Sequence, residues 1–145
     1  MEPRINVSKV DPKAYEAMIG LEKYLAQSGL DEILYELIKT RASQMNGCAY
    51  CINMHTRDAI ELGETPQRLF LLNAWRDTEL FTEKERAVLA LTEAMTLITN
   101  GHVPDDVYKE AEKQCTPKEL AAVIMAVVAI NGWNRIAITT RLSLD

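Results

Sequence analysis

The stretch TPKELAAVIMAVVAI, residues 116–130, decides the fold class of this chain. Thr116 and Glu119 have the spacing of a capping box, and Pro117 suits the first position of a helix. The 11 residues that follow, 120–130, are all apolar. A helix that is apolar nearly all round lies in the core of a soluble protein or at a subunit interface. We therefore expect a long central helix here, buried on all sides.

The rest of the chain also carries helix signals, and no segment shows a convincing alternation of apolar and polar residues. N-cap residues followed by proline or glutamate, apolar stripes at spacings of three and four, and Asn-Gly stops mark the helix boundaries. The expected helices cover residues 12–27, 30–46, 48–62, a short segment from 65, 82 to about 100, 105–113 and the long helix from 116. The sequence predicts an all-α fold.

Length and composition indicate one compact domain, covering residues 1–145. The chain has 145 residues, of which 48% are hydrophobic and 26% charged, close to the average of globular proteins. Its 21 acidic and 16 basic side chains give a net charge of -5. This balance, together with the lack of a glycine-rich phosphate loop, disfavours nucleic acid and anionic membranes as partners.

Neither a membrane span nor a secretory leader is expected. The longest uninterrupted apolar run is the segment 120–130, and a span needs about 18 to 20 residues. The chain opens with MEPRINVSKV, which has no apolar signal segment, and its three cysteines are too few for a secreted disulfide scaffold. These features predict a cytoplasmic protein.

Reactive groups concentrate in one stretch, NGCAYCINMH, residues 46–55. Cys48 and Cys51 are three residues apart at the start of a helix, so their Cβ atoms should lie about 5 to 6 Å apart and the sulfurs can form a disulfide. His55 follows Cys51 by four residues, on the same helix face. The imidazole can therefore act as a base for the Cys51 thiol, directly or through one water.

A cysteine in the first turn of a helix is favoured as the thiolate by the positive end of the helix dipole. A thiolate that attacks a peroxide oxygen becomes a sulfenic acid, which a second thiol converts to a disulfide. Cys51 would then be the attacking thiol and Cys48 the resolving thiol, although the residues alone also permit the exchanged roles.

Two other interpretations of the cysteine pair stay open. A structural zinc site needs four ligands, and the remaining candidates Cys115 and His102 form no recognisable second pair. Two buried core cysteines are also possible, since free cysteine is among the most buried residue types. We expect no metal and no tightly bound cofactor, and we expect Cys115 to be a bystander.

The sequence resembles the alkyl hydroperoxidase D-like proteins of the carboxymuconolactone decarboxylase superfamily. Their redox members carry a glutamate, eleven residues, and then Cys-x-x-Cys-x-x-x-His, which Glu36, Cys48, Cys51 and His55 match. The likeness extends over residues 30–140, which would form the core of the domain. Members with histidine before the second cysteine differ from this chain, which has Tyr50 there.

The resemblance implies a helical hairpin that carries the site, and assembly into homotrimers or homohexamers. It also implies a peroxidase in which Cys51 is the peroxidatic thiol, Cys48 the resolving thiol, and His55 with Glu36 a proton relay. Tyr50 would line the substrate site. An external dithiol, on a lipoyl-bearing or thioredoxin-like protein, would reduce the disulfide.

Three functions follow as hypotheses. The first is a thiol-dependent peroxidase that reduces hydrogen peroxide or small organic hydroperoxides, an alkyl hydroperoxide reductase-type antioxidant enzyme. The second is a redox-responsive regulatory or binding protein without rapid turnover. The third is a lactone enzyme of the carboxymuconolactone decarboxylase type, against which the intact Cys48 and Cys51 argue, because the true decarboxylases lack this pair.

Overall fold

A computed structural model describes residues 1–144 of the chain, and helices make up most of that range. No strand occurs among these residues, so the all-α prediction is confirmed. The elements are α1 (Val7–Val10), α2 (Pro12–Gln27), α3 (Glu32–Asn46), α4 (Ala49–Glu61), α5 (Pro66–Phe70), the 3-10 helix η1 (Leu72–Asp77), α6 (Glu83–Thr96), α7 (Asp105–Gln114) and α8 (Pro117–Thr140).

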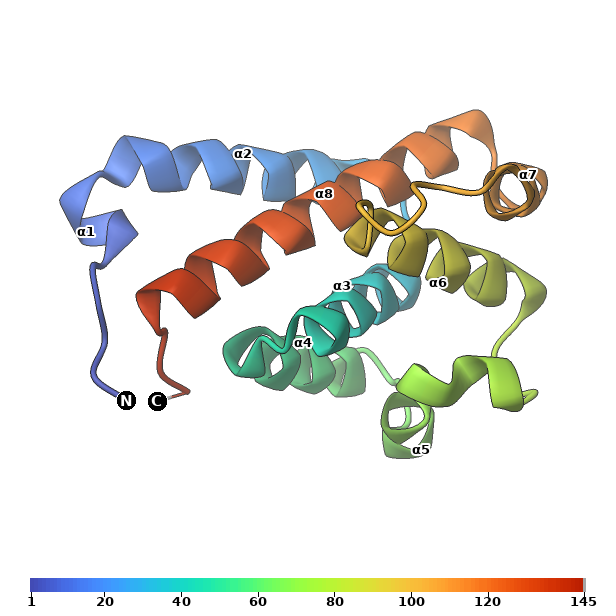
Figure 1. Cartoon of the computed structure of the whole chain (residues 1–145), viewed down its shortest axis with the longest axis horizontal. Coiled ribbons are helices and arrows are strands. Elements are labelled where there is room, and N and C mark those ends of the chain that lie inside the picture. The colour runs from blue at the N-terminus through green and yellow to red at the C-terminus, as the bar shows by residue number, and fades with distance from the viewer. Residues whose placement is uncertain (145) are drawn as a thin grey trace.

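Helix α8 crosses the whole molecule, with α2 beside it and α3 packed beneath it (Figure 1). Its inward face is fully buried at Val123, Ala126 and Ile130. The opposite face is open, because Val128 and Ile138 are 47% and 46% exposed. The expectation of burial on all sides is therefore wrong for the single chain, because a stripe of α8 that includes Val128 and Ile138 faces solvent.

By length and composition alone, α8 is also the one helix among residues 1–144 that could cross a membrane. The most apolar part of α8 has a mean hydropathy of 1.6 and is 44% buried within the protein. The core helix of a soluble protein passes the same test, so this is weak evidence for a span. The absence of a membrane span stays a prediction.

The helix starts follow the capping residues of the sequence. Thr82 and Thr116 each form a complete capping box, and Asp11 and Asp31 accept a backbone N–H as N-caps. The one-turn helix α1 was not expected. It begins after Asn6, whose side chain accepts the Lys9 N–H at 3.1 Å.

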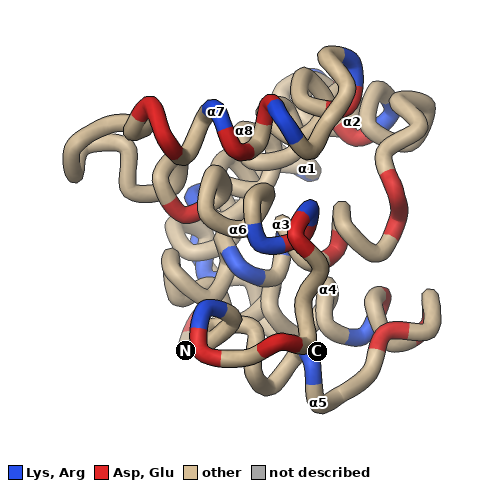
Figure 2. The backbone as a smooth tube through the Cα atoms, turned by 90° about the vertical axis from the view of Figure 1, so that its right-hand side faces the viewer, with Lys and Arg blue, Asp and Glu red and all other residues tan. Residues whose placement is uncertain are grey.

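Three clusters of apolar side chains hold the helices together, and the smallest includes the Cys48–Cys51 pair. The largest lies between α3, α6 and α8 and includes Ile38, Leu91 and Val127. The second surrounds Trp75 of η1 and includes Leu37 of α3 and Ala59 of α4. The hairpin of α3 and α4 is thus packed from two sides, which fixes the residues that it carries. Basic and acidic residues are interspersed over the surface (Figure 2).

Candidate active site

A tight turn between α3 and α4 places the two cysteines. Gly47 takes the left-handed conformation (φ 70°) that ends α3, as the Asn-Gly pair predicts. The Cys48 N–H then donates to the Ser43 carbonyl at 3.0 Å. Cys48 becomes the N-cap of α4, and its Sγ accepts the N–H of Cys51 at 3.3 Å. The cysteines therefore lie at the start of a helix, as the sequence predicts.

Cys48 and Cys51 form a disulfide, with their Cα atoms 5.3 Å apart. Both are almost completely buried, at 1% and 2% exposed. The prediction that the two sulfurs can form a disulfide is thus confirmed. Cys115 does not join them: it lies at the end of α7, where burial raises the pKa of its thiol.

His55 and Glu36 meet across the hairpin. The His55 Nδ1 lies 2.8 Å from the Glu36 Oε2, and both residues are buried. Since a carboxylate only accepts, this contact assigns the proton to Nδ1. The His55 Nε2 is buried without a hydrogen-bond partner. The His55 Nε2 is therefore available to accept a proton, one helical turn from Cys51.

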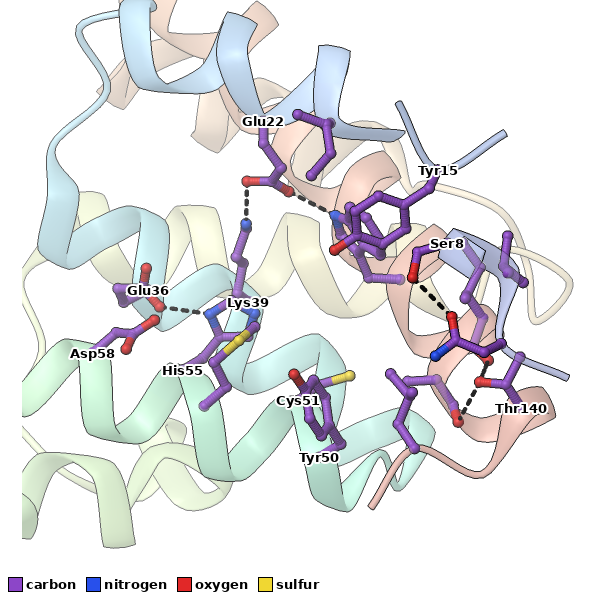
Figure 3. A pocket seen from close by; sticks show the side chains of 18 of the residues that line it. Ser8, Tyr15, Glu22, Glu36, Lys39, Tyr50, Cys51, His55, Asp58 and Thr140 are labelled. Atoms are coloured by element: carbon purple, nitrogen blue, oxygen red, sulfur yellow. Dashed lines mark hydrogen bonds and ion pairs between the residues drawn. The ribbon is translucent and has the colours of Figure 1, made fainter. Parts of the chain in front are cut away.

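Cys51 and His55 line a pocket with a volume of about 440 Å³ (Figure 3). Helices α1, α2, α3, α4 and α8 all contribute to its wall. Tyr50 lines it as well, and Cys48 does not. The apolar and aromatic part of the wall consists of Val7, Tyr15, Ile19, Tyr35, Tyr50, Met54, Trp133, Ile136, Ala137 and Leu142.

A charged group closes the α2 side of this pocket. Glu22 accepts hydrogen bonds from the Tyr35 hydroxyl, from the Lys39 Nζ at 2.6 Å and from the Trp133 Nε1 at 2.8 Å. Burial works against the Glu22 carboxylate, but Lys39 and these hydrogen bonds outweigh it and lower the pKa of Glu22. Glu22 therefore joins three helices as an ionised group.

Asp58 completes the polar end of the pocket. It lies one turn beyond His55 on α4, and Glu36, His55 and Asp58 each offer a ligand atom within 4.8 Å of the others. The His55 Nδ1 is already engaged by Glu36. This group contains no cysteine, so it is unlike the zinc site that the sequence left open.

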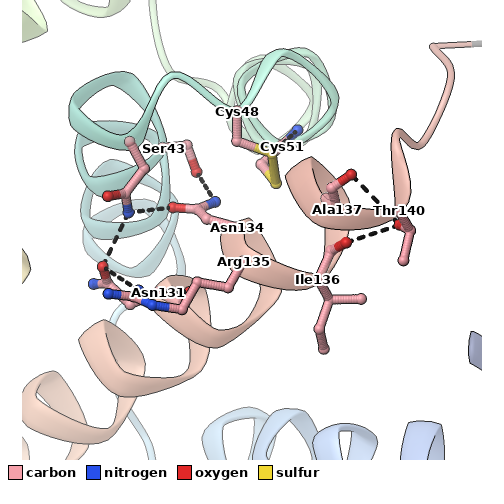
Figure 4. The surroundings of a disulfide bond; sticks show 10 residues. Ser43, Cys48, Cys51, Asn131, Asn134, Arg135, Ile136, Ala137 and Thr140 are labelled. Atoms are coloured by element: carbon pink, nitrogen blue, oxygen red, sulfur yellow. Dashed lines mark hydrogen bonds between the residues drawn. A yellow bond between two sulfur atoms is a disulfide. The ribbon is translucent and has the colours of Figure 1, made fainter. Parts of the chain in front are cut away.

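A buried polar network holds the cysteine turn from behind (Figure 4). Asn46 donates to the side-chain oxygens of Asn131 and Asn134, at 2.9 and 2.8 Å. Asn134, which is fully buried, donates in turn to the Ser43 Oγ at 2.9 Å. Helix α8 thus fixes the end of α3 just before the turn, and through the Ser43 carbonyl it supports Cys48.

Sequence reasoning missed Glu22, Lys39 and Asp58. Lys39 and Asp58 follow Glu36 and His55 by three residues, so each lies on the same helix face as a predicted site residue. That spacing could have found them. Glu22 gives no such signal, because it reaches the site only through the packing of α2 on α3 and α8.

Comparison with known proteins agrees with this geometry. The model of the carboxymuconolactone decarboxylase family matches residues 12–94, more than half of the chain. The chain belongs to this family. Within it, the uncharacterized protein YdfG of Bacillus subtilis is 40% identical over 138 residues, covering 95% of this chain and 94% of YdfG.

Solved structures place this member of the carboxymuconolactone decarboxylase family beside AhpD-like proteins. A crystal structure from Agrobacterium tumefaciens, of a protein of unknown function suggested to be the antioxidant defence protein AhpD, superposes with a TM-score of 0.96. It is 38% identical, and the match covers 99% of both chains. The debrominase Bmp8 shares the fold, with a TM-score of 0.84 at 17% identity over 94% of this chain and 74% of Bmp8. The resemblance drawn from the sequence is confirmed at the level of an AhpD-like family member.

Proposed function

We propose that this protein is a thiol-dependent peroxidase of the alkyl hydroperoxide reductase type. The observation that carries the proposal is the free Nε2 of the buried His55, in the same pocket as Cys51 and held by Glu36 at 2.8 Å. A base, a thiol and a partner thiol within one buried site are what the reduction of a peroxide needs.

The proposed reaction begins with reduced cysteines. The His55 Nε2 takes the proton of the Cys51 thiol. The Cys51 thiolate attacks one peroxide oxygen, the O–O bond breaks, and the leaving alkoxide takes that proton from His55. Cys51 is then a sulfenic acid. The Cys48 sulfur attacks the Cys51 sulfur, hydroxide leaves and is protonated to water, and the disulfide forms. Glu36 holds the imidazole and balances its charge while it carries the proton.

An external dithiol must then supply two electrons by thiol–disulfide exchange. Because Cys48 and Cys51 are 1% and 2% exposed, we propose a slender donor, a lipoyl-type dithiol that enters the pocket. A thioredoxin-like donor would need the pocket wall to open first. Such chemistry fits a reducing cytoplasm, which we propose as the compartment.

The first test is steady-state peroxide consumption with dihydrolipoamide as the reductant. The proposal expects turnover that disappears in Cys48→Ser and in Cys51→Ser, and falls by about 100-fold or more in His55→Ala. The exposed Asn53, on the same helix, provides a matched control as Asn53→Ala. Hydrogen peroxide and cumene hydroperoxide should be compared, because the pocket exceeds the size of hydrogen peroxide.

A wild-type protein that forms one disulfide and then stalls with every dithiol would overturn this proposal. It would favour the redox-responsive regulatory protein instead. Peroxide consumption that survives in both cysteine variants would show that other residues carry the chemistry. The lactone enzyme would then have to be considered again as an alternative function.

A further inference from the structure

The pocket contains one lysine and three carboxylates. Of the described residues that line it, Glu22, Glu36 and Asp58 are acidic and Lys39 is basic. The other titratable groups of the lining are the His55 imidazole, the tyrosine phenols and, in the reduced protein, the Cys51 thiol. Helices α1 and α8 contribute no charged side chain to the lining. The proposed reaction generates negative charge on sulfur and on oxygen in these surroundings, which the carboxylates alone would oppose.

Lys39 is held in a fixed position beside this chemistry. Its side chain is 4% exposed, its Nζ lies 2.6 Å from the Glu22 Oε2, and the Nζ stands 4.1 Å from the centre of the Tyr35 ring. Figure 3 shows its ammonium between Glu22 on one side and Glu36, Asp58 and His55 on the other. A single rotamer is thus fixed by hydrogen bonding and by the aromatic ring.

The carboxylates of the pocket favour the charged form of Lys39. Burial lowers the pKa of Lys39 from its ordinary value of 10.5, while Glu22, Glu36 and Asp58 work in the opposite direction. The ionised Glu22 favours the ammonium form of Lys39. It accepts one N–H of that ammonium, so the other N–H groups can face the pocket.

We propose that Lys39 is the electrostatic support of the Cys51 thiolate, and that Glu22 is the residue that positions it. This role rests on the proposed peroxidase function of the site. In the reduced protein the Lys39 charge offsets the carboxylates that line the same pocket as Cys51, and during peroxide cleavage it stabilises the negative charge that passes from sulfur to the leaving oxygen. Glu22 brings Lys39 there by linking α2, α3 and α8.

The test measures the reactivity of a single thiol against pH. In a Cys48→Ser, Cys115→Ser background, Cys51 is the one remaining cysteine, and its alkylation by iodoacetamide is followed from pH 5 to pH 10. Lys39→Met should move the midpoint of this profile upward by about one pH unit or more. Lys39→Arg should keep the midpoint, because it keeps the charge.

Two further variants separate electrostatics from damage to the fold. Lys23→Met removes an exposed lysine from α2 and should leave the midpoint unchanged. Glu22→Gln removes the carboxylate that holds the Lys39 ammonium, and should move the midpoint in the same direction as Lys39→Met. A merely structural role for Lys39 would alter the rate on the alkaline plateau and leave every midpoint in place.

The proposal is overturned if Lys39→Met leaves the midpoint where it is, or if Lys39→Arg shifts it as far as Lys39→Met. Since the alkylation assay contains no peroxide, its outcome is independent of peroxidase turnover. A shifted midpoint in a protein that consumes no peroxide would retain the role of Lys39 and reject the proposed function. Normal turnover with an unmoved midpoint would do the reverse.

Discussion

The role of Glu36 can be isolated at the scale of one residue, because a single oxygen contact joins it to His55. Glu36→Gln keeps an acceptor for the Nδ1–H but removes the negative charge. We expect kcat/KM for peroxide to fall by about 10- to 100-fold, since the imidazolium that forms loses its counter-charge. Steady-state kinetics across pH 5 to 9 measure this loss.

The exposed Glu32, on the same helix, provides the control. Glu32→Gln removes the same charge from α3 and should change kcat/KM by less than about twofold. If both glutamate variants lose activity equally, the effect is one of net charge, and the relay through Glu36 has no support.

At this scale, the sequence predicted those site residues that lie a few positions apart on one helix. Cys48, Cys51 and His55 share one helix start, and Glu36 was found only through the resemblance to a family. Lys39 and Glu22 were not predicted, because their contact joins two helices that are separate in the sequence. No periodicity within either helix reports that a lysine at 39 faces a glutamate 17 positions earlier.

At the scale of elements, the turn between α3 and α4 depends on the left-handed Gly47. Nothing lies within 4 Å of a Cβ added there, so Gly47→Ala carries conformational cost alone. We expect a loss of about 1 kcal/mol in the free energy of unfolding, because L-residues disfavour positive φ. Urea denaturation followed by circular dichroism measures it.

Gly20 offers the matched comparison, in the middle of α2 with equally open surroundings. Gly20→Ala should raise the free energy of unfolding by about 0.5 to 1 kcal/mol, since alanine is the better helix former. The two substitutions should therefore change the free energy of unfolding in opposite directions. A gain in Gly47→Ala would mean that the turn tolerates another conformation.

The polar network between α3 and α8 makes a second prediction for elements. Asn134→Ala removes the partner of the Ser43 hydroxyl and one of the two acceptors of Asn46. Leaving such buried groups unpaired costs about 1 to 3 kcal/mol, which chemical denaturation should show. The exposed Asn53→Ala should change the free energy of unfolding by no more than about 0.5 kcal/mol. Equal losses in both would argue against the network.

The helices themselves were largely predictable, because their caps and stops are local. Thr82, Thr116 and Gly47 fix boundaries through bonds to residues within a few positions. The expected burial of α8 failed for a tertiary reason: which of its apolar faces has a neighbour depends on where α2 and α3 lie. No pattern within α8 distinguishes those faces.

At the scale of the whole molecule, the fold should survive reduction of its disulfide. The bond closes a loop of only four residues, 48–51, for which loop entropy amounts to about 2 kcal/mol. The two larger apolar clusters contain neither cysteine of this bond. We expect dithiothreitol to lower the midpoint of thermal unfolding by a few degrees without unfolding the protein at 25 °C.

The Cys48→Ser, Cys51→Ser double variant is the control for this measurement, and without reductant it should melt near the reduced wild type. A reduced protein that loses its helical signal at 25 °C would contradict the prediction. In that case the disulfide would be a structural bond and not one that cycles.

Assembly is the second prediction for the whole molecule. The resemblance implies a homotrimer or homohexamer, and α8 presents the exposed apolar side chains Val128 and Ile138. Light scattering coupled to size exclusion should give a mass three or six times 16.3 kDa. A mass of one chain at micromolar concentration would reject this expectation.

The early and late parts of the chain meet beside the pocket. The Arg4 N–H donates to the Thr140 carbonyl at 2.9 Å, and N and C lie next to each other in Figure 1. Asn6 and Leu142 both belong to the pocket wall. A purification tag on either end would therefore lie beside the pocket. Joining the two ends and opening the chain between the exposed Glu79 and Leu80 would place both new ends at another part of the surface.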